Sequence, residues 1–256
     1  MTEPIERSPI ANARRVVIKL GTRAVSNASG GLDVDRLSDI VSYIGDMHRR
    51  GIEVLLVSSG AVGLGAHQLG LSLPVRALVN RQAAAAVGQS ELMSMYAEQF
   101  AGEGVKVAQV LVATGDFDNR SRYLNIRNTL LRLLRHQVIP IINENDAVSI
   151  AELKFVDQSS PVFGDNDRLS AIVASKMDAD LLVLLTDVPG VFDKDPTEHP
   201  DAQILHQIDK DWSGFETGNH KSEISRGGMK AKVAAAQIAV RSGCHAVIAS
   251  GLDSAA

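Results

Sequence analysis

The chain has 256 residues and a formal net charge of −4, and 45% of its residues are hydrophobic, 22% charged and 4% aromatic. These totals exclude a disordered or fibrous protein, and the low aromatic content without a long basic block argues against nucleic-acid binding. No apolar run approaches the roughly 20 residues of a membrane span. The single cysteine allows no internal disulfide, and residues 1–13 lack the apolar core of a signal peptide, so they are expected to be a loose polar leader. We therefore expect a cytoplasmic globular protein.

Short apolar strands alternate with amphipathic helices through the first half of the chain. A buried strand is predicted at Arg15–Leu20, and the helix after it begins at a cap on Asp33 or Asp35 and ends at Gly51. The further predicted elements are a strand at Ile52–Val57, a helix at about Asn80–Gly104, a strand at Val105–Val112, a helix at Arg120–Arg135 and a strand at Val138–Ile142.

The second half repeats this rhythm after a polar stretch, Lys154–Leu169. Asp165 is a natural cap for the helix that follows. The remaining predictions are a strand at Leu181–Leu185, a polar loop with short strands at Asp193–Arg226, a helix opened by Gly227-Gly228 and a last strand at Ala246–Ser250. Such alternation predicts an α/β protein, a three-layer αβα sandwich with a mostly parallel central sheet.

Polar or glycine-rich groups follow four of the predicted strands. Lys19 closes the first strand, Ser58–Gly60 follows the second, Asn143–Asp146 ends the strand before the polar stretch, and Thr186-Asp187 ends the strand after it. Because parallel strands bring their carboxyl ends to one edge of the sheet, where ligands bind, we expect these groups to form one site.

Two lysines and two glycine runs are candidates for phosphate binding. Lys19 is either a strand-end lysine whose amine reaches solvent or a phosphate ligand, since a lysine in an apolar strand is costly unless it is paired. The glycines of Ser59–Gly65 either offer main-chain N–H groups to an anion or permit close packing. Gly227-Gly228 repeats this pattern at an expected helix start, with Lys232 better directed than Lys230.

Several other site types are disfavoured by the spacing of residues. The histidines lack zinc-ligand spacing, and Ser59 has neither a nucleophile elbow nor an evident histidine partner. The Walker and dinucleotide fingerprints are absent, which disfavours a nicotinamide dehydrogenase. Cys244 precedes an apolar strand and is expected to be an inert core thiol.

Seven motifs, in order along the chain, resemble the amino acid kinase family and most of all its glutamate kinase branch. NENDAV and GDND are typical of that branch, whereas the lysine and glycine motifs are shared more widely. The chain is also similar to the kinase module of bifunctional pyrroline-carboxylate synthases. The motifs are VVIKLGT (Val16–Thr22), VSSGAVGLG (Val57–Gly65), AAVGQSELM (Ala85–Met93), PIINENDAV (Pro140–Val148), GDNDRLSA (Gly164–Ala171), LLTDVPGVF (Leu184–Phe192) and GGMKAKVAAA (Gly227–Ala236).

The resemblance implies one amino acid kinase domain over residues 14–256, with a substrate-binding lobe at about 14–163 and a nucleotide-binding lobe at about 164–256. The implied reaction is phosphorylation of the γ-carboxylate of L-glutamate by ATP, with Mg²⁺ held mainly by the ATP phosphates, as the first step of proline biosynthesis. The resemblance further implies feedback inhibition by proline. A homo-oligomer is also expected, with the alanine-rich segment near Asn80–Val87 as the candidate for packing against a partner subunit. Because the acyl phosphate product is labile, we also expect its transfer to a glutamate-5-semialdehyde dehydrogenase.

The same resemblance implies roles for individual residues. Lys19 and Lys232 would contact the transferring phosphoryl group, and Asp167 would hold both lysines. Glutamate would be bound by Ser59, Asp146, Asn166 and Asn143. The expected nucleotide-binding residues are Lys19, Thr186, Asp187, Arg226, Gly227, Gly228, Met229, Lys230, Ala231 and Lys232.

The expected chemistry agrees with this set. The γ-carboxylate of glutamate, with a pKa of about 4.3, is ionised at neutral pH and needs no general base. An aspartate in the site should therefore organise other groups rather than accept a proton. The substrate ammonium would pair with Asp146, and its carboxylates would take donors from Asn166 and Ser59.

The chain also departs from the family pattern. Many bacterial members carry a PUA domain, for which this chain leaves no room, and it stops at Ser250–Leu252, short of the family's closing strands, either naturally or as a fragment. Arg226 stands where bacterial members more often have threonine. A non-catalytic amino-acid sensor is the alternative function, although a sensor has no need of Lys19, Lys232 and Asp167.

Overall fold

The computed structural model describes residues 8–21, 33–148, 165–209, 211–212 and 223–251, and the polar segment Lys154–Phe163 therefore lies outside the described residues. Within them, six strands form one parallel sheet in the order β3-β4-β2-β1-β5-β6. The strands are β1 (Arg15–Leu20), β2 (Glu53–Ser58), β3 (Lys106–Val112), β4 (Val138–Glu144), β5 (Leu181–Thr186) and β6 (His245–Ser250).

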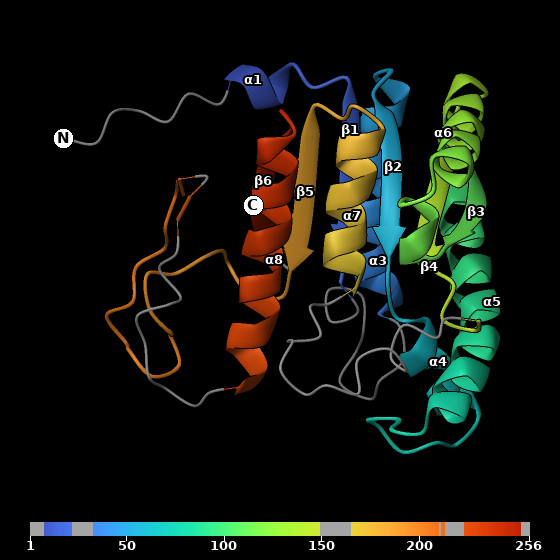
Figure 1. Cartoon of the computed structure of the whole chain (residues 1–256), viewed down its shortest axis with the longest axis horizontal. Helices are drawn as coiled ribbons and strands as arrows, with labels where there is room; N and C mark the ends of the chain where they lie inside the picture. The colour runs from blue at the N-terminus through green and yellow to red at the C-terminus, as the bar shows by residue number, and fades with distance from the viewer. Residues whose placement is uncertain (1–7, 22–32, 149–164, 210, 213–222, 252–256) are drawn as a thin grey trace.

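Helices cover both faces of this sheet, so the predicted three-layer α/β sandwich is confirmed. In Figure 1, α7 and α8 lie in front of the sheet and α3 lies behind it. The helices are α1 (Ser8–Ala11), α3 (Val34–Arg49), α4 (Ala61–Gln68), α5 (Leu78–Gly102), α6 (Arg120–Arg135), α7 (Asp165–Lys176) and α8 (Glu223–Arg241), with a 3₁₀ turn at Thr114–Asp116.

Alternate side chains of each strand enter two separate cores. On β1, Val16 and Ile18 join the core under α3 and α5, whereas Val17 joins the core under α6, α7 and α8. This alternation is the two-residue period of a strand buried on both faces. Because both faces are buried, only the ends of the strands are open to a ligand.

Most predicted elements match the structure, with ends shifted by one or two residues. The strand at Arg15–Leu20 and the helix at Arg120–Arg135 are confirmed without a shift, and Asp33 caps α3 by accepting a hydrogen bond from Arg36 N at 3.2 Å. The short helix α1 lies within the segment expected to be a loose leader.

The prediction that Gly227-Gly228 opens a helix is wrong. Helix α8 begins at Glu223, so these glycines lie in its second turn. Only the first four N–H groups of a helix, counted from its cap residue, lack intrahelical partners, and those of Gly227 and Gly228 lie beyond these four. Glycine costs about 1 kcal/mol in a helix interior, but Val233, Ala235 and the rest of the apolar face still bury against the sheet.

Helix α4 follows β2 directly, in a glycine-containing run for which no helix was predicted. Gly60 has a φ of 114°, a conformation that side chains rarely adopt, and it makes the turn from strand to helix. A Cβ on Gly65 would lie 1.8 Å from the main-chain oxygen of Ala84, and one on Gly88 would lie 1.9 Å from that of Ala61. These two glycines thus let α4 and α5 touch through their backbones.

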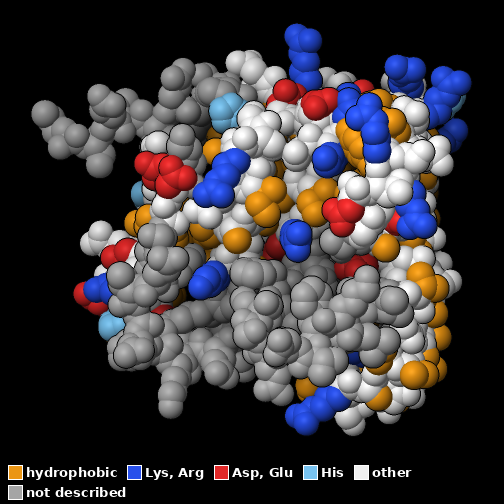
Figure 2. All heavy atoms as spheres, in the orientation of Figure 1, with side chains coloured by type: hydrophobic (Ala, Val, Ile, Leu, Met, Phe, Trp, Pro, Cys, Tyr) orange, Lys and Arg blue, Asp and Glu red, His pale blue; other side chains and the backbone are white. Residues whose placement is uncertain are grey.

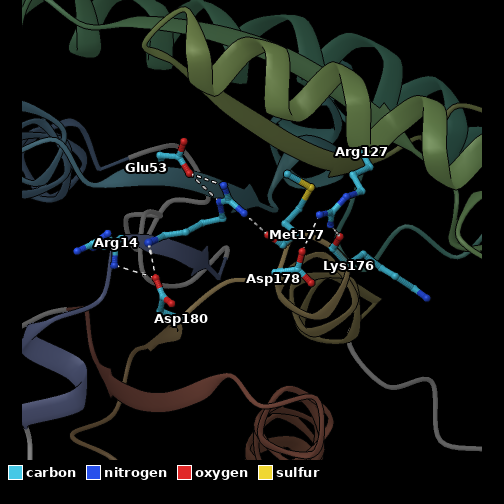
Figure 3. Close-up of polar contacts among 8 residues, drawn as sticks. Arg14, Glu53, Arg127, Lys176, Met177, Asp178 and Asp180 are labelled. Carbon is cyan, nitrogen blue, oxygen red and sulfur yellow. Dashed lines mark hydrogen bonds and ion pairs between the residues drawn. The ribbon is translucent and has the colours of Figure 1, made fainter.

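The edge where the strands begin is tied together by polar contacts, and Lys and Arg side chains gather along this upper edge in Figure 2. The main-chain amides of Arg14 and Arg15 both donate to Asp180 Oδ2 at 2.8 Å (Figure 3). The Arg15 guanidinium pairs with Glu53 at 2.6 Å and donates to the main-chain oxygen of Met177. The hydrogen bond from Arg15 N is the main cause that lowers the pKa of Asp180. These contacts align the starts of β1, β2 and β5.

No helix among the described residues is long and apolar enough to cross a membrane.

Candidate functional site

The register of the sheet brings the predicted polar groups to one edge. Lys19 is opposite Val57 of β2 and Leu184 of β5, and Val57 is opposite Ile142 of β4. The residues that follow these positions therefore leave the sheet side by side. In Figure 1 the arrowheads of β2 and β5 point to the lower edge, where α4 begins.

Asp167 lies between the two lysines that the sequence singled out. Its Oδ1 is 2.8 Å from Lys19 Nζ, and its Oδ2 is 3.2 Å from Lys232 Nζ. Lys19 comes from β1, Asp167 from the first turn of α7 and Lys232 from α8. Lys230 is exposed on α8, whereas Lys232 is partly buried, so the structure distinguishes the two lysines in the predicted sense.

This cluster carries a net positive charge in a buried place. Lys19 is 5% exposed and Asp167 is 3% exposed. Burial lowers the pKa of Lys19 below its ordinary 10.5, the Asp167 carboxylate acts against this shift, and the neighbouring Lys232 ammonium adds to it. Two ammonium groups that share one carboxylate leave one positive charge to stabilise an anion, and burial strengthens that attraction.

Asn166, next to Asp167 in α7, belongs to a chain of side-chain amides. Its Nδ2 donates to the main-chain oxygen of Ser58 at 2.9 Å and to Asn143 Oδ1 at 3.0 Å. Asn143 Oδ1 also accepts from the main-chain N–H of Glu144 at 2.9 Å, and Asn143 Nδ2 donates to Gln89 Oε1 at 2.7 Å. We call Gln89, Asn143 and Asn166 the amide relay; it joins α5, β4 and α7.

The expectation that Asn166 donates to a substrate carboxylate is not supported by these contacts, because both of its N–H groups are already engaged. Its Oδ1 is buried and has no hydrogen-bond partner among the described residues. The same holds for Gln89 Nε2, at the other end of the relay. Asn166 can therefore offer an acceptor to a ligand without breaking a hydrogen bond, but not a donor.

The two other predicted glutamate ligands border the same edge. The Ser59 hydroxyl donates to the main-chain oxygen of Leu20 at 3.0 Å, which ties the start of α4 to the end of β1. Asp146 lines a cavity of about 250 Å³ beside Ala61, Gln89 and Glu144. A cavity of this size between α4, α5 and the end of β4 can hold a ligand no larger than a small metabolite.

The predicted nucleotide residues lie on the other side of β1. Thr186, at the end of β5, is buried, and its hydroxyl donates to Asp187 Oδ1 at 3.2 Å. On α8, Met229 precedes Lys230, Ala231 lies between Lys230 and Lys232, and Gly228 is exposed. The side chain of Arg226 and the surroundings of Gly227 lie outside the part of the chain whose side chains are described.

Two residues that support the site were missed in the sequence. Gln89 is 8% exposed, and Tyr96 is fully buried, with its hydroxyl 2.8 Å from Ser58 Oγ. Burial raises the pKa of Tyr96 to about 12. Both project from the buried face of α5, which also carries Ala85, Leu92 and Phe100. The sequence signal for these two residues was a polar side chain at positions where the helical spacing of α5 predicts buried apolar residues.

Comparison with known proteins gives consistent results. The model of the amino acid kinase family matches residues 14–250. The chain is 44% identical over 242 residues to a glutamate 5-kinase of Methanococcoides burtonii, which covers 94% of this chain and 63% of that protein. It is 45% identical over 255 residues to a glutamate 5-kinase of Moorella thermoacetica, covering 99% and 65%. The chain thus spans less than two thirds of the length of these relatives.

Solved structures with the same fold are much less similar in sequence. A carbamate kinase from Giardia lamblia bound to AMP-PNP has a TM-score of 0.64 at 17% identity, covering 94% of both chains. An isopentenyl phosphate kinase of T. acidophilum in a product complex has a TM-score of 0.63 at 18% identity, covering 94% of this chain and 92% of that one. At such identities the likeness concerns the fold alone.

Proposed function

The chain belongs to the amino acid kinase family, and from this membership we propose that it phosphorylates the γ-carboxylate of L-glutamate with ATP. The observation that carries the proposal is the pair Lys19 and Lys232 on the two oxygens of Asp167. The identity of 44% to 45% with glutamate 5-kinases over nearly the whole chain supports the choice of acceptor. The products are ADP and L-glutamyl 5-phosphate.

The two lysines fit the charge changes of this reaction. A γ-carboxylate oxygen attacks the γ-phosphorus of ATP, the bond to the bridging oxygen breaks, and ADP leaves with that electron pair. Because the nucleophile is already ionised, no proton has to move. Phosphoryl transfer then depends on alignment and on positive charge at the phosphoryl oxygens, and Lys19 and Lys232 are placed to supply that charge.

Asp167 acts in this proposal as an organiser of the lysines. Each of its oxygens faces one ammonium group, so the carboxylate is not available as a metal ligand without giving up a lysine. Mg²⁺ would therefore arrive on the ATP phosphates, where it would neutralise part of the phosphate charge. The main-chain N–H groups at the start of α4 offer further donors to an anion at the same edge.

The amino-acid end of the substrate would lie toward α4 and β4. The Asp146 carboxylate borders the 250 Å³ cavity and has the charge that an α-ammonium group requires. Asn166 and Asn143 lie between this cavity and the lysine cluster in the chain of contacts. On the nucleotide side we propose Thr186, Asp187 and residues 226–232.

An acceptor panel tests the proposal. ADP release is measured with ATP and Mg²⁺ in the presence of L-glutamate, L-aspartate, N-acetylglutamate, carbamate or UMP. We expect turnover with glutamate at least about 100-fold above the others in kcat/KM, since a site built for one polar group rejects its analogues strongly. Turnover with another acceptor only would refute the assignment. Calorimetric binding of glutamate without any ADP release would instead indicate an amino-acid sensor.

We further propose, from the same family membership, a cytoplasmic enzyme that is inhibited by proline, forms a homo-oligomer and passes its product to a glutamate-5-semialdehyde dehydrogenase. Ala84 and Ala85, in the alanine-rich segment near Asn80–Val87, are buried within the chain, so these two residues are not part of the surface that we propose for a subunit contact.

A further inference from the structure

The amide relay has a direction that two main-chain groups determine. The carbonyl of Ser58 can only accept a hydrogen bond, so Asn166 must turn its NH₂ group toward it. The N–H of Glu144 can only donate, so Asn143 must turn its oxygen toward it. The NH₂ group of Asn143 then faces Gln89, which must present its own oxygen.

With the amides oriented in this way, the relay ends in the carboxamide oxygen of Asn166. Asn166 is also the relay residue next to the lysine cluster, because Asp167 follows it in the sequence. The oxygen is buried without a hydrogen-bond partner among the described residues. A buried acceptor without a donor is rare in native proteins and requires an explanation. The group on the proposed substrate that can only donate is its α-ammonium.

We propose that Gln89 is a positioning residue for recognition of the substrate ammonium group. By holding Asn143, it keeps the Asn166 oxygen turned toward the ligand, where that oxygen accepts a hydrogen bond from the ammonium. Asp146 supplies the negative charge that pairs with the ammonium group, whereas the hydrogen bond to Asn166 fixes the orientation of that group. This inference rests on the proposed function and deepens it, because it names the group of glutamate that the amide relay recognises.

The position of Gln89 suits this role. It lies on the buried face of α5, whose backbone packs so closely against that of α4 that neither Gly65 nor Gly88 has room for a Cβ atom. Helix α5 therefore holds Gln89 at a defined distance from β4. Without the Gln89 oxygen, Asn143 Nδ2 would be an unpaired donor in a place that is 2% exposed. Asn143 would then rotate toward another acceptor and release Asn166.

The test compares L-glutamate with glutarate, which has the same two carboxylates but no ammonium group. The Michaelis constant for glutamate and the inhibition constant of glutarate are measured for the wild type and for Gln89→Met, a variant of similar length without a hydrogen-bonding amide. We expect the glutamate KM to rise about tenfold, or about 1.4 kcal/mol, with kcat and the glutarate constant each within threefold of wild type.

Three further variants make the result specific. Gln89→Glu keeps an oxygen for Asn143 and should hold the glutamate KM within threefold. Gln99→Met, a matched change on the same helix outside the relay, should behave as wild type. Should Gln89→Met not fold, as judged by its thermal midpoint, Gln89→Leu is used for the same comparison.

Equal weakening of glutamate and glutarate, or an unchanged glutamate KM in Gln89→Met, would overturn the role of Gln89 while leaving the proposed function intact. Absence of glutamate-dependent turnover in the wild type would refute the proposed function and this role with it. A tenfold loss in Gln89→Glu as well would also overturn the role, since the accepting oxygen is retained there.

Discussion

At the residue scale, Lys232 and Lys230 form a matched pair on one helix. Lys232 Nζ lies 3.2 Å from Asp167 Oδ2, whereas Lys230 is exposed. Lys232→Ala should lower kcat by about 100-fold or more, the loss that follows removal of one group that stabilises transition-state charge, with a smaller effect on the glutamate KM. Lys230→Ala should leave kcat within about threefold. Steady-state kinetics checks both, and equal losses would show that Lys232 has no special place in the site.

The lowered pKa of Lys19 predicts a pH dependence. The protonated ammonium is the form that can bind phosphate, and burial lowers its pKa in the free enzyme. Activity should therefore be lost as pH rises through a midpoint below 10.5, and this limb should appear in kcat/KM for ATP, which reports on free enzyme. NMR of ¹³C-labelled lysine, with Lys19→Arg for assignment, measures the titration directly. A Lys19 signal that titrates at or above 10.5 would contradict this prediction.

At the element scale, the contact between α4 and α5 depends on Gly65. Gly65→Ala would bring a Cβ to 1.8 Å from the Ala84 oxygen, so the helices must separate, and we expect a loss of about 1–3 kcal/mol in the free energy of unfolding. Gly63→Ala in the same helix meets nothing within 4 Å and should be neutral or stabilising by about 0.5–1 kcal/mol. Urea unfolding distinguishes them, and similar effects of both changes would contradict the packing argument.

The elements that could be predicted are those whose signals are local. Helix α6 has a capping Asn119 and an apolar stripe, and β1 is a continuous apolar run with one lysine. Helix α4 could not be predicted, because its glycines read as a loop until α5 is packed against it. The start of α8 was predicted too late for a related reason. Packing further along the helix outweighs the low helix propensity of Gly227 and Gly228.

The candidate site divides in the same way. Lys19, Asp167 and Lys232 could be found because strand ends and short motifs mark them, and in the structure the Nζ atom of each lysine lies within 3.2 Å of an Asp167 carboxylate oxygen. The direction of the amide relay could not be found, because it depends on a main-chain oxygen of Ser58 and a main-chain N–H of Glu144 meeting side chains from three elements. The spacing of residues in a sequence does not show whether a side-chain amide donates through its NH₂ group or accepts through its oxygen.

At the scale of the whole molecule, the two ligands should stabilise the fold independently. A ligand at 100 times its Kd adds about 2.7 kcal/mol, which for a chain of this size raises Tm by roughly 5–10 °C. Asp146→Ala should lose the shift caused by glutamate and keep the shift caused by AMP-PNP with Mg²⁺. Differential scanning fluorimetry measures both shifts. A variant that keeps the glutamate shift would remove Asp146 from the substrate site.

The central claim is that the γ-carboxylate of glutamate becomes an acyl phosphate on this chain. Hydroxylamine converts acyl phosphates to hydroxamates, so the most direct measurement is mass-spectrometric detection of the hydroxamate formed with ATP, Mg²⁺ and L-glutamate. We predict γ-glutamyl hydroxamate in a one-to-one ratio with ADP for the wild type, and little of either for Lys232→Ala. Release of ADP without hydroxamate, or a hydroxamate at the α-carboxylate, would contradict the account.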